Sequence, residues 1–328
     1  MLLPVRNAQA TLGDCLESLS AQTFPDFELI ALDDGSHDAS RALLEAAARR
    51  DPRVRLVVEP QRGIVAALNQ ALAHVRAPLI ARMDADDVAH PERLALQVLR
   101  LARDPDVDLL GCGVRVIGGV RNAGLRAYAE WSNRLLSHDD ITRDLFVESP
   151  LVHPSWMARK EAFADLGGYR EDAGPEDYDL LLRAYARGMR FAKLPEILLD
   201  WRDSETRLTR CDPRYDPDRF RERKIEALVA GPLGVGRPTV IWGAGPIGKS
   251  WAKDLRARGV EVRAFIDVHP RRIGQRIHGV LVADVRAATA HAGALHLLAL
   301  GQPGARERAR RLARSLGLSE LDDFVAVA

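Results

Sequence analysis

In the first part of the chain, short apolar runs alternate with segments whose apolar residues recur at helical spacing. The runs predict strands at 1–5, 28–32, 53–58, 78–82 and 107–111, and the spaced segments predict helices at 12–22, 40–50, 64–75 and 91–103. This alternation is typical of a parallel sheet with helices on both faces. The first run is short, so either the sheet accepts a short strand or the natural chain begins upstream of Met1.

The pattern is looser over 115–169, where 149–159 favours a pair of short strands. It then resumes as a helix at 175–187 and a strand at 194–201. A second alternation predicts strands at 239–242, 260–267, 295–300 and 324–327, with helices at 247–258 and 306–316. Prolines and glycines flank a charged, helix-like stretch between the two patterns, which indicates a connector. We therefore expect an α/β chain with one domain over 1–212, a connector over 213–236 and a smaller domain over 237–328.

Composition narrows the choice of partners and compartment. The chain has 47 Lys and Arg against 46 Asp and Glu, a net charge of +1, so no electrostatic field favours nucleic acid. Its three cysteines, Cys15, Cys112 and Cys211, lie far apart without a metal-ligand spacing, which is typical of reduced thiols in a cytoplasmic protein. No apolar run reaches the roughly 18 residues of a membrane span. We expect a cytoplasmic protein, with peripheral membrane contact left open.

Two acidic clusters follow predicted strands. Asp33-Asp34-Gly35-Ser36 comes after the second strand and Asp84-Ala85-Asp86-Asp87 comes after the fourth. Open α/β sheets bind ligands at the carboxyl ends of their strands. Clustered carboxylates repel one another, and a hard divalent ion carrying a diphosphate offsets that repulsion. The alternative is that these aspartates form turns and cap helices, but two clusters in one predicted sheet favour a binding site.

The two clusters belong to a series of motifs that covers about residues 1–210. In chain order the motifs are LPVRN (3–7), LDDGS (32–36), GIVAALN (63–69), IARMDADD (80–87), HPERL (90–94), VHPS (152–155), GGYR (167–170), EDYDL (176–180) and LDWR (199–202). In this order they resemble inverting family 2 glycosyltransferases of the GT-A fold. The resemblance implies transfer of a sugar from a nucleotide-diphosphate sugar to a hydroxyl of a glycan, lipid-linked or other acceptor. The chain lacks the Gln-x-x-Arg-Trp motif of processive synthases, so we expect a non-processive enzyme.

The resemblance also implies roles for individual residues. Residues expected to bind the nucleotide sugar are Pro4, Asp33, Asp34, Asp84 and Asp87. Residues expected to hold Mg²⁺ or Mn²⁺ are Asp86 and Asp84. Candidates for the acceptor side are His153, Gly168 and Tyr169, with a packing role left open for His153.

The resemblance assigns the chemical step to Asp177, beside Glu176. A sugar nucleotide already has a good leaving group, so the protein has only to remove a proton from the acceptor hydroxyl. One carboxylate is enough, and an aspartate with an ordinary pKa of about 3.9 is ionised at neutral pH. The alternative for Asp177 is an acid that stabilises the start of a helix.

The smaller domain opens with Gly243-Ala244-Gly245-Pro246-Ile247-Gly248 between a predicted strand and a predicted helix, and Asp267 closes the next strand. Such glycines, helix start and acid are the context of a dinucleotide-binding turn, which assigns Gly243, Gly245, Gly248 and Asp267 to a second nucleotide site. Residues 265–268, 272–274 and 277–282 resemble the small Rossmann-like domain that precedes sugar acyltransferases. Binding of NAD(P) or another nucleotide there stays open. Two alternatives to the transferase therefore remain: an NAD-dependent sugar-modifying enzyme and a non-catalytic sugar-nucleotide-binding module.

Overall fold

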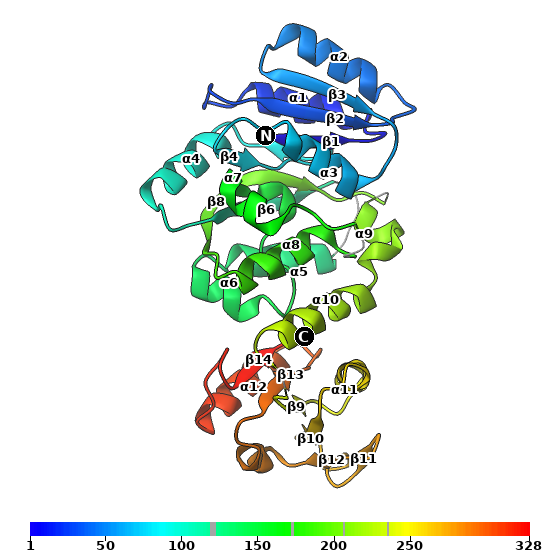
Figure 1. The fold of residues 1–328 in the computed structure, drawn as a ribbon, viewed down its shortest axis with the longest axis vertical. Coiled ribbons are helices and arrows are strands. Elements are labelled where there is room, and N and C mark those ends of the chain that lie inside the picture. Colours follow the sequence, from blue (N-terminus) through cyan, green and yellow to red (C-terminus); the bar gives the residue numbers. More distant parts are fainter. Residues whose placement is uncertain (119–122, 172–173, 206, 235) are drawn as a thin grey trace. The chain divides into compact units, whose positions relative to one another are not determined.

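The protein folds into two compact α/β units in a computed structural model that describes residues 1–118, 123–171, 174–205, 207–234 and 236–328 (Figure 1). The first unit comprises Met1–Ile141 and Pro150–Asp216. The second unit comprises Thr142–Ser149 and Pro217–Ala328. The predicted fold class, α/β with a larger first unit and a smaller second one, is confirmed.

The first unit begins with a parallel sheet in the order β1-β2-β3. Its strands are β1 (Leu2–Val5), β2 (Leu29–Asp34) and β3 (Val54–Glu59), and the helices after them are α1 (Leu12–Ser20), α2 (Ser40–Arg50) and α3 (Ile64–Ala73). Asp33 pairs with Val5 on one side and with Val58 on the other. The expectation that Asp33 and Asp34 follow their strand is therefore wrong. Both aspartates are the last residues of β2, because pairing on both sides extends the strand through them.

A second sheet of the first unit has the order β4-β7-β6-β8-β5. Its strands are β4 (Leu79–Ala81), β5 (Val88–Ala89), β6 (Leu109–Ile117), β7 (Met157–Arg159) and β8 (Phe191–Arg202). Only β6 and β8 pair in parallel, whereas the other three pairs are antiparallel. The predicted all-parallel sheet is thus wrong for this half, because apolar spacing does not show the direction of a strand and β5 is too short to leave a periodic pattern. A bridge between Leu2 and Arg82 joins the two sheets.

The loosely patterned middle of the chain is largely helical. Within 115–169 the structure has α5 (Ala123–Asn133), α6 (His138–Asp144) and α7 (Lys160–Leu166), with the short 3₁₀ helix η1 (His153–Ser155). Outside that stretch, the first unit also contains α4 (Arg93–Arg103) and α8 (Glu176–Ala186), where the sequence predicted helices, and α9 (Leu208–Cys211) and the 3₁₀ helix η2 (Pro213–Tyr215). The stretch 149–159, expected as two strands, contains η1 followed by β7. Pro154 lies inside η1 and has no N–H to give to a sheet. No helix among the described residues is both long enough and apolar enough to cross a membrane.

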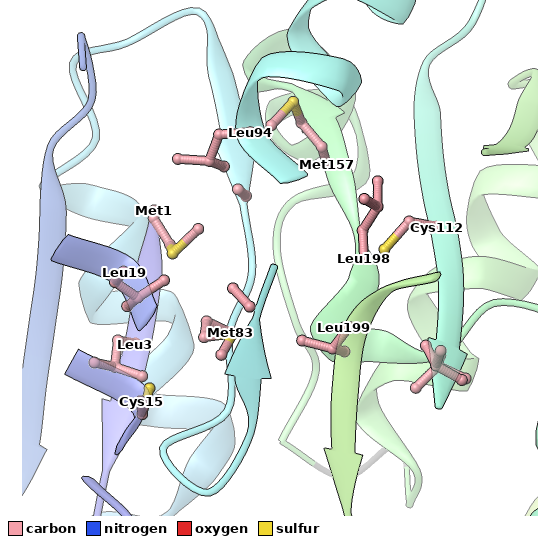
Figure 2. Packing of buried hydrophobic residues seen from close by; sticks show 14 of the residues in the cluster. Met1, Leu3, Cys15, Leu19, Met83, Leu94, Cys112, Met157, Leu198 and Leu199 are labelled. Carbon is pink, nitrogen blue, oxygen red and sulfur yellow. The ribbon is translucent and has the colours of Figure 1, made fainter. Parts of the chain in front are cut away.

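Apolar side chains from β1, α1, β6 and β8 form the core of the first unit around the strand that leads to the acidic cluster. In Figure 2, Met83 lies between Leu3 of β1 and Leu199 of β8, and all three are fully buried. Ala85 belongs to the same core, whereas Asp84 and Asp86 on either side of it are partly exposed. Burial of alternate residues therefore fixes the direction in which these two carboxylates point.

The second unit contains a sheet in the order β11-β12-β10-β9-β13-β14, parallel except for the β11–β12 hairpin. Its strands are β9 (Thr239–Trp242), β10 (Val262–Ile266), β11 (Arg276–Ile277), β12 (Val280–Ala283), β13 (Leu295–Leu298) and β14 (Phe324–Ala326). Its helices are α10 (Pro217–Ala230), α11 (Pro246–Ala257) and α12 (Ala305–Ser315), with a 3₁₀ helix η3 (Val285–Ala290). The expected connector contains α10, which buries Ile225 and Leu228.

Buried charges hold the segment 142–149 in the second unit. Arg310 of α12 is 3% exposed and forms an ion pair with Asp144, which is equally buried, and with Glu320 at 2.7 Å. Lys224 of α10 donates a hydrogen bond to the Val147 carbonyl at 2.7 Å. The second unit therefore combines two segments that lie far apart in the sequence.

Replacing Arg310 by alanine leaves the Asp144 and Glu320 carboxylates without their buried cation. We expect the free energy of unfolding to fall by about 3 to 5 kcal/mol, as happens when one partner of a buried ion pair is removed. Urea unfolding followed by tryptophan fluorescence measures this change, because Trp242 and Trp251 lie in the second unit. Arg311→Ala, at an exposed position of α12, is the matched control and should change stability by less than about 0.5 kcal/mol. Equal unfolding midpoints for both variants would contradict the structural role of Arg310.

Candidate functional site

The acidic cluster lies on a tight turn between β4 and β5. Past β4, the Met83 N–H donates to the Leu2 carbonyl at 3.0 Å, which continues the strand. The chain then turns, and the Asp87 N–H reaches back to the Asp84 carbonyl at 3.3 Å. Carboxylate oxygens of Asp84, Asp86 and Asp87 come within 4.8 Å of one another. The structure thus brings together the two residues predicted to hold a metal and adds Asp87.

Burial and neighbouring charge raise the pKa of two carboxyl groups of this turn. Burial, and then the neighbouring Asp84 charge, raises the pKa of Asp86 to about 6. Burial and the charges of Asp84 and Asp86 raise the pKa of Asp87 well above its ordinary value. One oxygen of Asp87 accepts the Arg202 N–H at 2.8 Å, whereas its Oδ2 is buried without a hydrogen-bond partner among the described residues. Three clustered oxygen donors, one of them unsatisfied, fit a hard divalent cation.

Two buried arginines support the turn. Both lie within the sequence motifs, but neither was predicted to be a site residue. Arg82 is 5% exposed and forms an ion pair with Asp84. Arg93 is fully buried and donates to the Arg82 carbonyl at 2.7 Å and to the Pro154 carbonyl at 2.6 Å. Arginine is almost never fully buried unless it is paired. An arginine inside a predicted apolar strand, as at Arg82, was the available signal.

Asp33 and Asp34 shape the loops at the carboxyl-terminal edge of the first sheet. Asp34 accepts the N–H groups of Arg62 at 2.7 Å and Gly63 at 2.9 Å, one on each carboxylate oxygen. It thereby holds the entry to α3. Asp33 accepts the Ser36 N–H at 3.2 Å in a turn at the end of β2. The turn role that the sequence left open is therefore present for both residues.

Pro4, the remaining nucleotide-binding candidate, is buried in β1 opposite Leu32. This register places Pro4 one residue before the Val5–Asp33 pair, at the carboxyl end of β1. The proline therefore belongs to the strand edge where ligands of open α/β sheets bind.

Glu176 and Asp177 open α8, directly after Pro175. Burial, followed by the Glu176 charge, raises the pKa of Asp177 to about 7. The expectation of an ordinary aspartate pKa is therefore wrong, because it ignored desolvation at the start of this helix. Arg82 opposes the shift at Asp177 while it pairs with Asp84, so one cation interacts with both acidic groups.

His153 and Tyr169 form a buried pair. The His153 Nε2 atom and the Tyr169 hydroxyl are 2.8 Å apart. Burial, and then the Arg82 charge, lowers the pKa of His153 well below its ordinary value, so the ring is neutral. Since these polar atoms face each other inside the protein, the geometry favours the packing role that the sequence left open for His153.

Asn69 fixes the backbone of the Gly-Gly-Tyr motif. Its side-chain amide donates to the Tyr169 carbonyl at 2.8 Å and accepts the Tyr169 N–H at 2.9 Å. Gly168 has a φ of +73°, and a Cβ atom there would come within 2.7 Å of the Asn69 Oδ1 atom. Two motifs that lie far apart in the sequence, GIVAALN and GGYR, are thus joined by one amide.

A cavity of about 770 Å³ elsewhere in the first unit is lined by Met1, Glu28 and Arg53, among others. These three residues directly precede β1, β2 and β3, so the cavity lies at the amino-terminal ends of those strands. None of the predicted site residues lines it. We therefore assign the site to the opposite, carboxyl-terminal edge, where the carboxylates gather.

In the second unit, the structure brings together the four residues of the predicted dinucleotide turn. Gly243 has a φ of +105°, and a Cβ atom on Gly248 would come within 1.9 Å of the Gly243 carbonyl oxygen. Gly245 precedes α11 directly. The backbone of the turn therefore requires glycine at 243, and its close approach to the helix requires glycine at 248, whereas a Cβ atom on Gly245 would meet only the Arg272 Nη1 atom at 3.8 Å.

Asp267 is engaged by its own loop. Its oxygens accept the N–H groups of Ala244 at 2.9 Å and His269 at 2.8 Å, and it forms an ion pair with Arg272 at 3.0 Å. Burial raises the pKa of Asp267, but these contacts outweigh burial and lower it below the ordinary value. The carboxylate predicted to bind ribose hydroxyls thus stabilises the glycine turn.

Comparisons with known proteins agree with the geometry of the first unit. Residues 1–167 match Glycosyl transferase family 2. The chain is 30% identical over 225 residues to the putative glycosyltransferase EpsE of Bacillus subtilis, covering 66% of this chain and 77% of EpsE. It is 31% identical over 189 residues to the amylovoran biosynthesis glycosyltransferase AmsE of Erwinia amylovora, covering 57% of this chain and 69% of AmsE.

Among solved structures, the fold resembles S. aureus TarS 1–349 in complex with UDP-GlcNAc. The TM-score is 0.58 at 18% identity, covering 71% of this chain and 66% of that chain. The match spans 38% of a longer TarS chain. At this identity the likeness concerns the fold alone. The family match and the two relatives carry the assignment: this chain belongs to glycosyltransferase family 2 and is a glycosyltransferase.

Proposed function

We propose that this enzyme transfers a sugar from a nucleotide-diphosphate sugar to a hydroxyl of a glycan, lipid-linked or other acceptor, non-processively and with inversion. The observation that carries the proposal is the combination of three clustered carboxylates with a separate carboxylate, Asp177, whose pKa is raised to about 7. Relatives named for amylovoran and O-antigen biosynthesis support a role in bacterial envelope polysaccharides. We place the reaction in the cytoplasm, in peripheral contact with the membrane where the acceptor is lipid-linked.

On the donor side, we assign Asp84, Asp86 and Asp87 to binding Mg²⁺ or Mn²⁺ together with the donor diphosphate. When bound, the ion neutralises charge that develops on the leaving diphosphate. The buried, unsatisfied Oδ2 of Asp87 and the raised pKa of Asp86 support a cation at this position. Pro4 lines the nucleotide pocket. Asp33 and Asp34 shape it through the turns that they stabilise.

On the acceptor side, we assign Asp177 as the general base. A base whose pKa lies near the working pH is the most effective, because much of it is deprotonated and it still binds a proton strongly enough to remove it from the acceptor. Only one carboxylate is needed for a single displacement that inverts the anomeric centre. Glu176 tunes that carboxylate by its charge. Gly168, Tyr169 and His153 support the acceptor side from within the packed motif.

In the second unit, we propose that Gly243, Gly245 and Gly248 accept a nucleotide phosphate at the start of α11. Ribose recognition by Asp267 is not part of this proposal, because the loop already uses its oxygens.

Donor binding can be tested by thermal shift with nucleoside diphosphates and nucleotide sugars, with and without Mn²⁺ or Mg²⁺. A ligand at about 100 times its Kd stabilises the native state by about 2.7 kcal/mol, so we expect a rise of a few degrees in Tm that needs the metal. Asp86→Asn should abolish this rise, and Asp106→Asn, at an exposed aspartate outside the cluster, should keep it. If no nucleotide diphosphate shifts the wild type in the presence of metal, the proposal fails. NAD and NADP on the same plate test the second unit.

Replacing Asp177 by asparagine should lower kcat by about a hundredfold or more while donor binding is retained. A carboxyl group whose pKa is raised in the folded state destabilises the fold increasingly above its unfolded pKa and fully above its folded pKa, so we do not expect removal of its charge to unfold the protein at neutral pH. Steady-state transfer assays with a thermal-shift measurement of donor binding separate the two effects. Unchanged turnover would exclude Asp177 as the base. A change in nicotinamide absorbance during turnover would instead support an oxidoreductase.

The pH dependence of the wild type follows from the same carboxylate. Asp177 accepts a proton only when it is ionised, so kcat/KM should rise as the pH passes through about 7 and should fall about tenfold per unit well below it. Initial rates between pH 5 and 9, in roughly half-unit steps, test this expectation. A rate that is flat down to about pH 5 would mean that the base has an ordinary aspartate pKa.

A further inference from the structure

Tyr215 contacts the catalytic pair from a part of the chain that no motif covers. It is the last residue of η2, and its hydroxyl donates to the Glu176 Oε2 atom at 2.7 Å. Glu176 is 3% exposed, so this hydrogen bond forms away from bulk water. Tyr215 and Glu176 are 39 residues apart in the sequence and both lie in the first unit.

Contacts between neighbouring residues hold the turn that carries Tyr215. Asp212 accepts the Arg214 N–H at 2.9 Å and pairs with the Arg214 guanidinium through both carboxylate oxygens. Pro213 between them fixes its own φ angle. The phenol is therefore held in place by its own segment, which lowers the entropic cost of its bond to Glu176.

We propose that Tyr215 is a positioning residue of the transfer reaction, which holds Glu176 in its charged form beside Asp177 and so sets the pH at which Asp177 accepts a proton. The inference rests on the proposed role of Asp177 as the base. A hydrogen bond to an ionised carboxylate stabilises that form, and a nearby negative charge makes the next carboxylate harder to ionise.

Charged and titratable groups around the pair support this chain of effects. Burial raises the pKa of Glu176 above its ordinary value, and the Tyr215 hydrogen bond and the charges of Arg82 and Arg214 oppose that shift without cancelling it. At Asp177, burial and then Glu176 raise the pKa, against the Tyr178 N–H and Arg82. Burial raises the pKa of Tyr169 and of Tyr215 above the ordinary value, so both phenols stay neutral.

The sign of the effect follows from these contacts. Without the Tyr215 hydroxyl, Glu176 keeps its proton to a higher pH and loses its negative charge in the range where Asp177 titrates. The pKa of Asp177 then falls, so the acid limb of the rate profile moves to lower pH. A hydrogen bond to a charged group corresponds to a shift of about one pH unit.

The first test compares kcat/KM profiles of the wild type, Tyr215→Phe and Tyr185→Phe. Tyr185 lies near the other end of α8, so its variant removes a hydroxyl from the same helix without touching the pair. We expect the acid limb to move down by about one pH unit for Tyr215→Phe only. Adding Tyr215→Phe to Glu176→Gln should cause no further shift, since the phenol acts through that carboxylate. The proposal is overturned if the acid limb of Tyr215→Phe stays where it is in the wild type. It is also overturned if the shifts of the two single variants add in the double variant.

The second test does not depend on turnover. The ¹³C resonance of the Asp177 carboxyl group, identified by its loss in Asp177→Asn, reports its titration directly. We expect this titration near pH 7 in the wild type and lower in both Tyr215→Phe and Glu176→Gln. If Glu176→Gln leaves the titration in place, the inference is wrong whether or not Tyr215→Phe folds. If instead the proposed function is wrong, the Asp177 titration still shifts as expected in both variants, but the wild-type protein transfers no sugar.

Discussion

A single buried cation, the guanidinium of Arg82, allows the carboxylates of this site to share one folded unit. It pairs with Asp84 and opposes the raised pKa of Asp87, Glu176 and Asp177. Burying that many acids without a compensating charge would protonate them or unfold the site. Arg93, which is also buried, joins the backbone of Arg82 to that of Pro154 in η1. The position of the acidic turn therefore depends on an arginine pair beneath it.

The same arrangement separates two chemical roles among similar side chains. Burial and the neighbouring Asp84 charge raise the pKa of Asp86 and of Asp87 within a cluster that fits a cation. Asp177 has its pKa raised mainly by burial and by one neighbour, Glu176, whose charge is supported by Tyr215. Environments that push the pKa values of neighbouring acids apart are how proteins assign an acid, a base and a binding group. Here the surroundings, and not the residue type, distinguish the proposed base from the proposed metal-binding acids.

The second unit shows how a motif can be present while its expected contacts are already used. The glycines of the turn at 243–248 meet the steric conditions for a close approach to the helix. The carboxylate of Asp267, however, already accepts a hydrogen bond from that turn and forms an ion pair with Arg272. The second unit also contains residues 142–149, which contact Arg310 and Lys224. No sequence pattern indicated that this segment belongs to the second unit.

The sequence by itself determined the family, the order of most strands and helices, and the identity of the acids, because motif order and apolar periodicity are local properties. It missed β5, the mixed sheet and the helices of 115–169, where short elements leave no period, and of the two strands expected over 149–159 the structure has only β7. Only the tertiary structure decided that Asp33 and Asp34 end a strand, that Asp87 joins Asp84 and Asp86, and that Tyr215 reaches Glu176. It alone also set the pKa of Asp177, since desolvation and neighbouring charge depend on residues that folding brings together from distant parts of the chain.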